Sequence, residues 1–190
     1  MADSKPSRVR LYLTALVMLA EVAHLAWEYF NGGVRSHHIL NRSDLPEISN
    51  WLGLLLLPAL SWHLIGRIQK RIALHSGGTG TASKFPTGVV TGFIGSLLFG
   101  ILLSVSFTND HETVASLLFR GMFLLALLLP AYRAEYLLGF VLGMTFTFGA
   151  VLPTAIGTLF VVLSAGAHLL VRPALMRIWT RLKGSRSPAF

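Results

Sequence analysis

Three ionisable side chains, Glu21, His24 and Glu28, interrupt a stretch of otherwise apolar residues near the N-terminus. In a helix, at about 100° per residue, their spacing places all three on one face. Glu21 and Glu28 are then separated by about 10.5 Å along the helix axis, with His24 between them. Ionisable groups inside a membrane are costly and mark proton, ion or solute sites. The pattern predicts a polar track, with Glu28 near the surface and Glu21 deeper.

Two further histidines, His37 and His38, follow in the polar loop after this stretch. A set of His24, Glu28, His37 and His38 would offer imidazole and carboxylate ligands, which suit a transition metal such as Zn or Fe. The same cluster could instead bind a proton or a small solute, or form structural ion pairs. The sequence leaves these alternatives open and predicts that the loop histidines fold over the outer end of the track.

One basic residue, Arg120, lies inside a later apolar stretch, at a depth similar to that of Glu21. A buried arginine in lipid requires a carboxylate partner or an anionic ligand. We therefore predict that Arg120 faces Glu21 or Glu28. The alternative is that Arg120 and His24 together bind an anionic group.

Two tryptophans and two histidines form further pairs near the ends of the apolar stretches. Trp27 and Trp51 fit an aromatic belt at the outer surface, or a stack on a ligand at the mouth of the site. His63 and His168 each precede an arginine by four residues, which places both at one depth near the inner surface. Two such histidines on different helices could ligate a haem, or their rings could extend toward water.

The composition indicates what kind of protein must position these residues. Of the 190 residues, 53% are hydrophobic and 13% are charged, and the mean hydropathy is +0.64. A soluble domain of this size requires a more polar surface, since about 25% of its residues are ordinarily charged. The chain is therefore predicted to be an all-α, polytopic integral membrane protein with a single domain over residues 1–190. The absence of cysteine excludes thiol catalysis and thiolate metal sites.

Six stretches approach the roughly 20 apolar residues that a membrane-spanning helix requires. They cover residues 9–30, 45–66, 86–107, 114–131, 136–152 and 154–171, and the last two are separated at Pro153. The second is predicted to begin at a helix cap formed by Ser43 or Asp44, followed by Pro46 and Glu47.

Lys and Arg are distributed unequally about these six stretches. Thirteen of the 16 fall on one side, whereas Arg35 and Arg42 fall on the other. Positive residues are retained in the cytoplasm, so both termini are predicted to be cytoplasmic, in a bacterial-type inner membrane, with a basic tail over residues 172–190. The net charge of +8 is attributed to this distribution and to anionic lipid, and not to nucleic acid.

Small residues recur every four positions in the third and fifth stretches. They are Gly88, Gly92, Ser96 and Gly100 in the third stretch and Gly139 and Gly143 in the fifth. Such a stripe lets another helix approach closely. It predicts tight packing inside one subunit, or alternatively a homodimer seam or a contact in a larger membrane complex.

In length and number of spans, the chain is similar to the substrate-capturing subunits of energy-coupling-factor transporters. That similarity implies an outward-facing site with the first outward loop as its lid. The docking pattern of their first helix is not reproduced, because Ala15, Ala20, Ala23 and Ala26 lack its four-residue rhythm. Three functions remain compatible with the residues: binding or transport of a small solute or ion, an intramembrane metal-dependent enzyme with Glu21 as its base, and a non-catalytic subunit.

Overall fold

The computed structural model describes residues 8–38, 47–75 and 85–184, most of which are helical. The helices are α1 (Arg8–Phe30), α2 (Gly53–His75), α3 (Thr87–Thr108), α4 (Glu112–Leu128), α5 (Ala134–Phe148), α6 (Val151–Ala165) and α7 (Arg172–Gly184). A 3-10 turn, η2 (Asn50–Leu52), precedes α2, and a π-helical segment, η3 (Gly166–Val171), joins α6 to α7. Two short antiparallel strands, β1 (Ser36–His38) and β2 (Glu47–Ser49), lie between α1 and η2.

In the described part of the chain, four helical segments are long and apolar enough to cross a membrane. They are α1, Asn50–His75, α3 and Val151–Thr180. The prediction of an all-helical fold is therefore confirmed, and these four segments support the prediction of a membrane protein. The shorter helix α5 is buried along most of its length, from Leu137 to Thr145, because other helices surround it.

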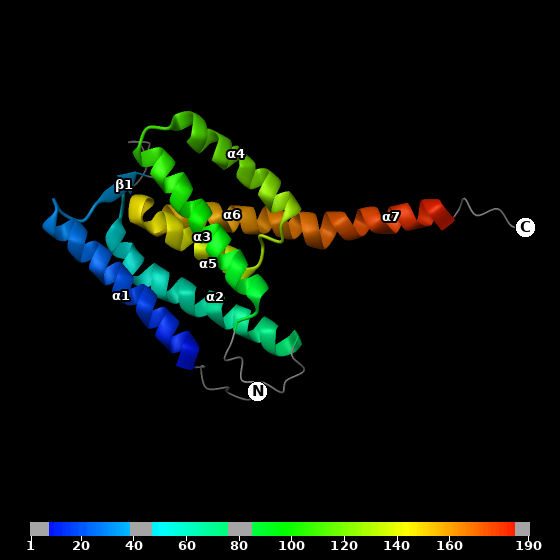
Figure 1. Cartoon of the computed structure of the whole chain (residues 1–190), viewed down its shortest axis with the longest axis horizontal. Coiled ribbons are helices and arrows are strands. Elements are labelled where there is room, and N and C mark those ends of the chain that lie inside the picture. The colour runs from blue at the N-terminus through cyan, green and yellow to red at the C-terminus, as the bar shows by residue number, and fades with distance from the viewer. Residues whose placement is uncertain (1–7, 39–46, 76–84, 185–190) are drawn as a thin grey trace, which may run out of the picture.

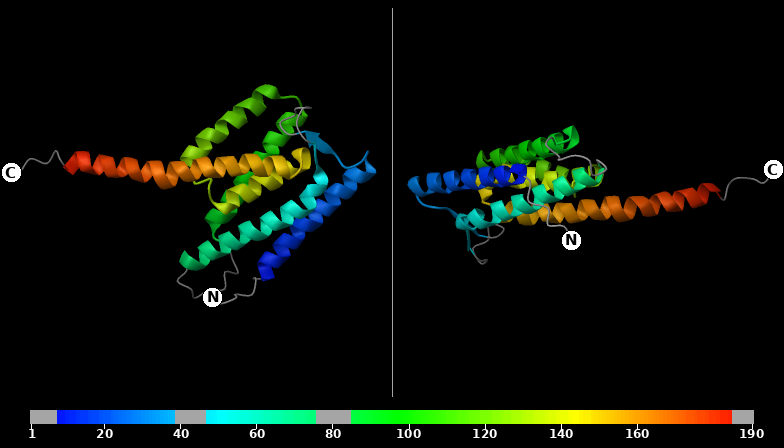
Figure 2. Two further views of the ribbon diagram at one scale, coloured as in Figure 1. Left: turned by 180° about the vertical axis from the view of Figure 1, so that it is seen from behind. Right: turned by 90° about the horizontal axis from the view of Figure 1, so that it is seen from below.

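The helices are arranged around α5 (Figure 1). Helix α1 lies against α2 at one edge, and α5 packs on α2, α3 and α6. Helix α4 lies on α3 and α6 at the opposite edge, away from α1, as two further views also show (Figure 2). Leu57, Leu64 and Val141 belong to the core between α2 and α5. Met122 and Phe160 belong to a second core between α3, α4, α5 and α6.

Among the described elements, helices α3 and α5 make the most extensive contact, and small residues form it. A Cβ atom at Gly139 would overlap Ser96 Oγ and the Phe93 carbonyl oxygen, and one at Gly100 would lie 2.8 Å from the Phe140 carbonyl oxygen. The small residues of the two stretches therefore pack against each other inside one subunit. Gly88 is an exception, because a Cβ there meets nothing within 4 Å among the described residues, so Gly88 does not take part in this α3–α5 contact, and its role in a homodimer seam stays a prediction.

The predicted start of the second helix is also wrong. Glu47 lies in β2, where it pairs with His38, and helical structure begins at Asn50. The Ser49 hydroxyl accepts a hydrogen bond from the Trp51 backbone N–H and so caps the first turn. Residues 43–46 lie outside the described part of the chain.

The break between the last two apolar stretches occurs at Gly149, and not at Pro153 as predicted. Gly149 has a φ of 66°, which favours glycine. Pro153 instead lies in the first turn of α6, where its missing N–H breaks no intrahelical hydrogen bond. The glycine therefore terminates α5, and the proline is accommodated in the next helix.

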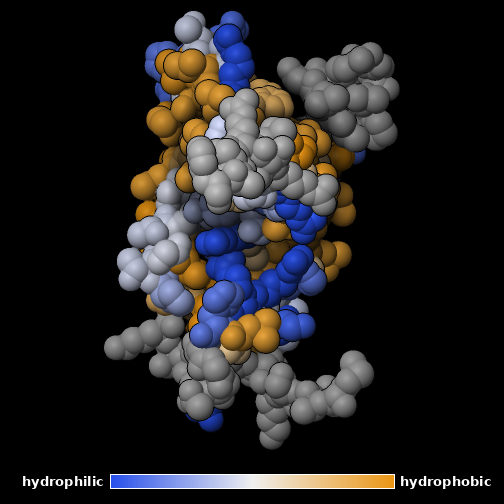
Figure 3. Space-filling view, turned by 90° about the vertical axis from the view of Figure 1, so that its right-hand side faces the viewer, coloured by the Kyte–Doolittle hydropathy of each residue, from blue (hydrophilic) through white to orange (hydrophobic). Residues whose placement is uncertain are grey.

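Helices α6 and α7 form one continuous rod with η3, and α7 extends away from the bundle (Figure 1). At about 1.5 Å per residue the rod is about 50 Å long, which exceeds the roughly 30 Å of the hydrocarbon layer. Viewed from the side toward which α7 points, hydrophilic surface is gathered between hydrophobic areas (Figure 3). Arg67 on α2 and Arg133 before α5 are both exposed.

Candidate functional site

The three ionisable residues of α1 form one buried cluster. The exposed fraction is 3% for Glu21 and 2% for Glu28. The His24 ring lies between them, with Nδ1 3.6 Å from Glu21 Oε2 and Nε2 3.7 Å from Glu28 Oε1. All three side chains point toward the protein, because they occupy the face of α1 that packs on α2. We call these residues the α1 cluster.

Glu28 connects the α1 cluster to the hairpin that follows α1. The Asn50 side-chain nitrogen donates to both carboxylate oxygens of Glu28, at 2.9 and 3.2 Å. The Arg35 backbone N–H donates to Glu28 Oε2 at 3.3 Å, and the Asn50 backbone N–H donates to the Arg35 carbonyl at 3.0 Å. One buried carboxylate therefore holds both ends of the β1–β2 hairpin over the C-terminal end of α1.

Two glycines and one phenylalanine form the opposite wall of the cluster. A Cβ at Gly53 would overlap Glu21 Oε1, and a Cβ at Gly149 would overlap Asn50 Oδ1. The Phe146 ring lies 4.9 Å from the His24 ring and 5.6 Å from the Trp27 ring, centre to centre. The start of α2 thus approaches α1 closely, and the turn after α5 approaches Asn50 closely, because neither carries a side chain at these positions.

In the part of the chain that the structure describes, no arginine or lysine is paired with the carboxylates of the α1 cluster. Among the described residues, the ion pairs of Glu21 and Glu28 are those with His24. Both nitrogens of His24 are buried and have no hydrogen-bond partner within the described segments. A proton or a cation placed between the imidazole and a carboxylate would supply the missing interaction.

The other buried carboxylate, Glu135, has the opposite environment. Its side chain is 1% exposed, and Arg71 Nη2 donates to Glu135 Oε1 at 2.7 Å. This ion pair joins α2 to the first turn of α5 and is absent from our sequence-based predictions. The sequence offers one signal for this ion pair. An acidic residue stands at the start of one apolar stretch, and another apolar stretch ends in basic residues.

Arg120 does not face Glu21 or Glu28, so this prediction is wrong. The side chain is exposed, with Nε donating to the Ser116 carbonyl at 3.1 Å and Nη2 donating to Ser116 Oγ at 3.0 Å. Helix α4 packs on α3 and α6, whereas α1 packs on α2. Equal depth along two helices does not make them neighbours, and α5 lies between these two (Figure 1).

The two tryptophans and the strand β1 lie near the Glu28 end of the cluster. Trp27 is 47% exposed and Trp51 is 54% exposed, so both reach the surface beside the site. The backbone of β1 pairs His37 with Ile48 and His38 with Glu47, but these histidine side chains lie outside the described part. Within the described part, no three histidine, aspartate or glutamate side chains are arranged as ligands of one metal ion. A metal site that includes the loop histidines stays a prediction.

The two histidines considered for haem have different surroundings. His63 is exposed on α2. His168 lies in η3, where its Nδ1–H donates to the Ser164 carbonyl at 3.0 Å and its ring lies 5.9 Å from the Tyr132 ring. The α2 and η3 segments share no extensive contact, and the structure adds no support for a haem between them.

Asn50, Gly53, Phe146 and Gly149 are the residues of the site that sequence reasoning missed. A polar residue directly before an apolar stretch, as Asn50 is, and a glycine inside a long apolar run, as Gly149 is, are the available signals. Neither signal identifies the neighbouring helix. Comparison with family models, curated proteins and solved structures finds no match to this chain.

Proposed function

We propose that this integral membrane protein binds a proton or a small cation at the α1 cluster, exchanges it with the outer surface and transports it across the membrane. The observation that carries the proposal is one buried imidazole between two buried carboxylates, with no arginine or lysine paired to them among the described residues. Two ionised carboxylates in a medium of low dielectric constant are strongly destabilised unless positive charge compensates them. A bound proton or cation provides that compensation.

The arrangement of His24 supports movement of a proton along α1. Each ring nitrogen faces a different carboxylate, at 3.6 Å and 3.7 Å. An imidazole can accept a proton at one nitrogen and donate another from the second nitrogen. Glu28, which is held beside the outer hairpin, would exchange protons with the surface, and Glu21 would hold them at greater depth.

We further propose that six helices cross the membrane and that both termini lie in the cytoplasm. Four segments are long and apolar enough to cross the membrane. Helices α4 and α5, which alternate in direction, would supply the other two crossings. The excess of Lys and Arg on the side of the termini supports the orientation. The α1 cluster then opens toward the outer surface.

Cysteine labelling tests this orientation, because the natural chain contains no cysteine. Ser36, in the exposed hairpin, and Thr180, on α7, are both exposed. We expect a membrane-impermeant maleimide to label Ser36→Cys in intact cells and to label Thr180→Cys only after the cells are opened. Labelling of Thr180→Cys in intact cells would contradict the proposed orientation.

Proton uptake into vesicles tests the function. We reconstitute the full chain in liposomes containing a pH-sensitive dye and impose an inside-negative membrane potential. Glu21→Gln and His24→Gln are expected to lower the rate of uptake by about tenfold or more, since each removes a group that transfers the proton. The rate of proton uptake is measured at the same potential with and without sodium. A lower rate in sodium would indicate that this cation competes with the proton for the site.

Glu112→Gln is the matched control, because Glu112 is exposed on α4 outside the cluster. It should take up protons at the rate of the natural protein. If the variants of Glu21 and His24 retain that rate as well, the proposed function is wrong. Stoichiometric zinc or iron in the purified protein, lost in His24→Ala, would instead support the metal-dependent enzyme that uses Glu28, His37 and His38.

A further inference from the structure

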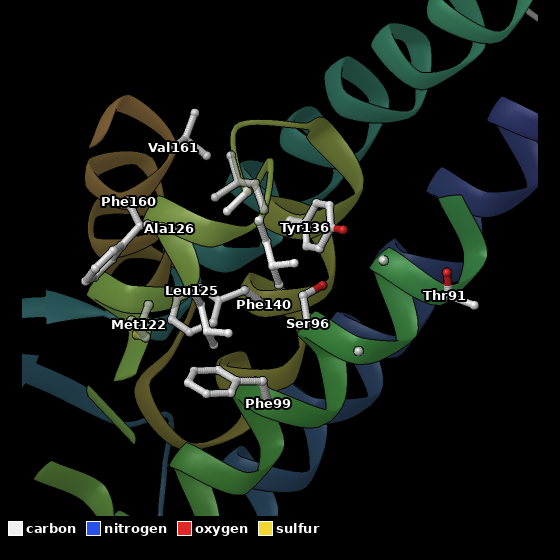
Figure 4. A pocket seen from close by; sticks show the side chains of 16 residues that line it. Thr91, Ser96, Phe99, Met122, Leu125, Ala126, Tyr136, Phe140, Phe160 and Val161 are labelled. Carbon is white, nitrogen blue, oxygen red and sulfur yellow. The ribbon is translucent and has the colours of Figure 1, made fainter. Parts of the chain in front are cut away.

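A separate cavity of about 370 Å³ lies between α3, α4, α5 and α6 (Figure 4). Each helix contributes apolar side chains, including Phe99, Met122, Phe140 and Phe160. No residue of α1 or α2 lines it, so it is distinct from the α1 cluster. Its volume falls within the roughly 300–1,000 Å³ of sites that hold small organic ligands.

The cavity lies where α3 and α4 diverge. The two helices are joined at one end by the turn around Asn109 and separate toward the other end (Figure 1). The lining residues come from the first half of α3, Thr91 to Phe99, and from the last part of α4, Met122 to Leu125 and beyond. In a membrane, the divergence of two outer helices exposes such a cavity to lipid.

Polar groups are placed at one end of the cavity. The side chains of Tyr136 and Ser96 lie close together there, and Phe99 lies toward the other end (Figure 4). The Ser96 hydroxyl donates to the Phe93 carbonyl at 3.0 Å. The Tyr136 hydroxyl has no hydrogen-bond partner among the described residues, so it is available to a ligand.

The order of residues along α5 matches the order of chemical groups in a phospholipid. Arg133 is exposed at the start of α5, Tyr136 follows about 4.5 Å further along the helix axis, and Phe140 lies about 6 Å beyond Tyr136. A cation, a hydrogen-bond donor and an apolar wall therefore follow one another toward the middle of the membrane. A phosphate, an ester carbonyl and an acyl chain follow one another in the same direction.

We propose that this cavity binds one acyl chain of a bilayer phospholipid. The Tyr136 hydroxyl donates to an ester carbonyl of that lipid, and the Arg133 guanidinium contacts its phosphate. The acyl chain lies between Phe99, Met122 and Phe140. An apolar solute without an anionic group would leave Arg133 unused, which is why the charge favours a phospholipid.

Substitution of Gly95 tests the proposal. Gly95 lines the cavity, and a Cβ there meets nothing within 4 Å among the described residues, so Gly95→Phe introduces a ring at the cavity wall without a clash at Cβ. The matched control is Gly88→Phe on the same helix, which also meets open space but does not line the cavity. Leu125→Trp fills the cavity from the opposite wall and serves as a second blocking variant if Gly95→Phe does not fold.

The probe is phosphatidylglycerol with a photoactivatable acyl chain, added to the full-length protein in detergent. Native mass spectrometry is expected to show one bound lipid per chain, and cross-links should map to Phe99 and Met122. Gly95→Phe should weaken binding by about tenfold, and Tyr136→Phe should weaken it several-fold through the lost hydrogen bond. Gly88→Phe should bind as the natural protein does.

Four outcomes would overturn the proposal. One is equal lipid binding by the natural protein and both blocking variants. Another is cross-linking confined to helices that do not line the cavity. The third is a dimer of the natural chain that retains no lipid and dissociates in Gly95→Phe, because a second copy would then occupy the cavity. The fourth is displacement of the probe by a simple alkane as effectively as by unlabelled phosphatidylglycerol, because Arg133 would then contribute nothing to binding.

Discussion

Gly143→Leu is expected to prevent stable folding of the protein. A Cβ at Gly143 would overlap the Leu97 carbonyl oxygen and lie 3.0 Å from the Ile101 backbone nitrogen and 3.2 Å from Gly100 Cα. All three are backbone atoms of α3, so no side chain can rotate away to make space. Overpacking in a well-packed interior costs about 1–3 kcal/mol or more, and we expect the upper part of this range, since α3 and α5 must separate.

The measurement is the yield and thermal stability of monodisperse protein in a mild detergent. Gly88→Leu is the control, because it adds the same side chain to α3 where a Cβ meets open space. Leu98→Ala, at a position that is 58% exposed, should likewise have a small effect. Similar yield and melting temperature for Gly143→Leu and Gly88→Leu would show that α3 and α5 do not pack at these glycines.

Arg71→Ala is expected to lower the free energy of unfolding by about 3 kcal/mol, because it leaves a buried carboxylate without its partner. Glu135 is 1% exposed, and its second oxygen, Oε2, already has no hydrogen-bond partner within the described segments. Replacing both residues, as in Arg71→Leu with Glu135→Leu, should recover most of the loss, since apolar groups of similar size require no charge compensation.

Chemical unfolding of the purified protein in detergent measures these differences. Arg67→Ala is the matched control, because Arg67 is an exposed arginine one turn earlier on α2, and its loss should change stability by less than about 0.5 kcal/mol. A double variant less stable than Arg71→Ala would indicate that Glu135 has another function. Equal stability of Arg71→Ala and Arg67→Ala would contradict the structural role of the ion pair.

The shared face of Glu21, His24 and Glu28 could be predicted from the sequence because it depends on one helix alone. A regular helix turns by about 100° per residue, so residues three and seven positions apart meet without reference to any other element. The membrane class could be predicted for a similar reason. It depends on composition and on the length of apolar stretches, which are properties of the chain and not of its packing.

Boundaries between elements were less predictable, because competing local signals are resolved by neighbours. Pro153 was a plausible break, but Gly149 terminates α5, where the turn approaches Asn50 too closely for a side chain. Glu47 was a plausible first-turn residue, but it pairs with His38 in the hairpin. At both positions, a contact with another segment of the chain determines which of two local structures forms.

The partners of the ionisable residues were decided by the tertiary structure. Arg120 and Glu21 were assigned similar depths, yet α4 and α1 lie on opposite sides of α5, and Arg120 bonds to its own helix. Depth describes only the position of a residue along the membrane normal. Many arrangements of the same helices therefore give two residues the same depth. Which helices become neighbours depends on the packing of whole surfaces. That packing, and not local spacing, pairs Arg71 with Glu135 and, within the described segments, brings no arginine to the α1 cluster.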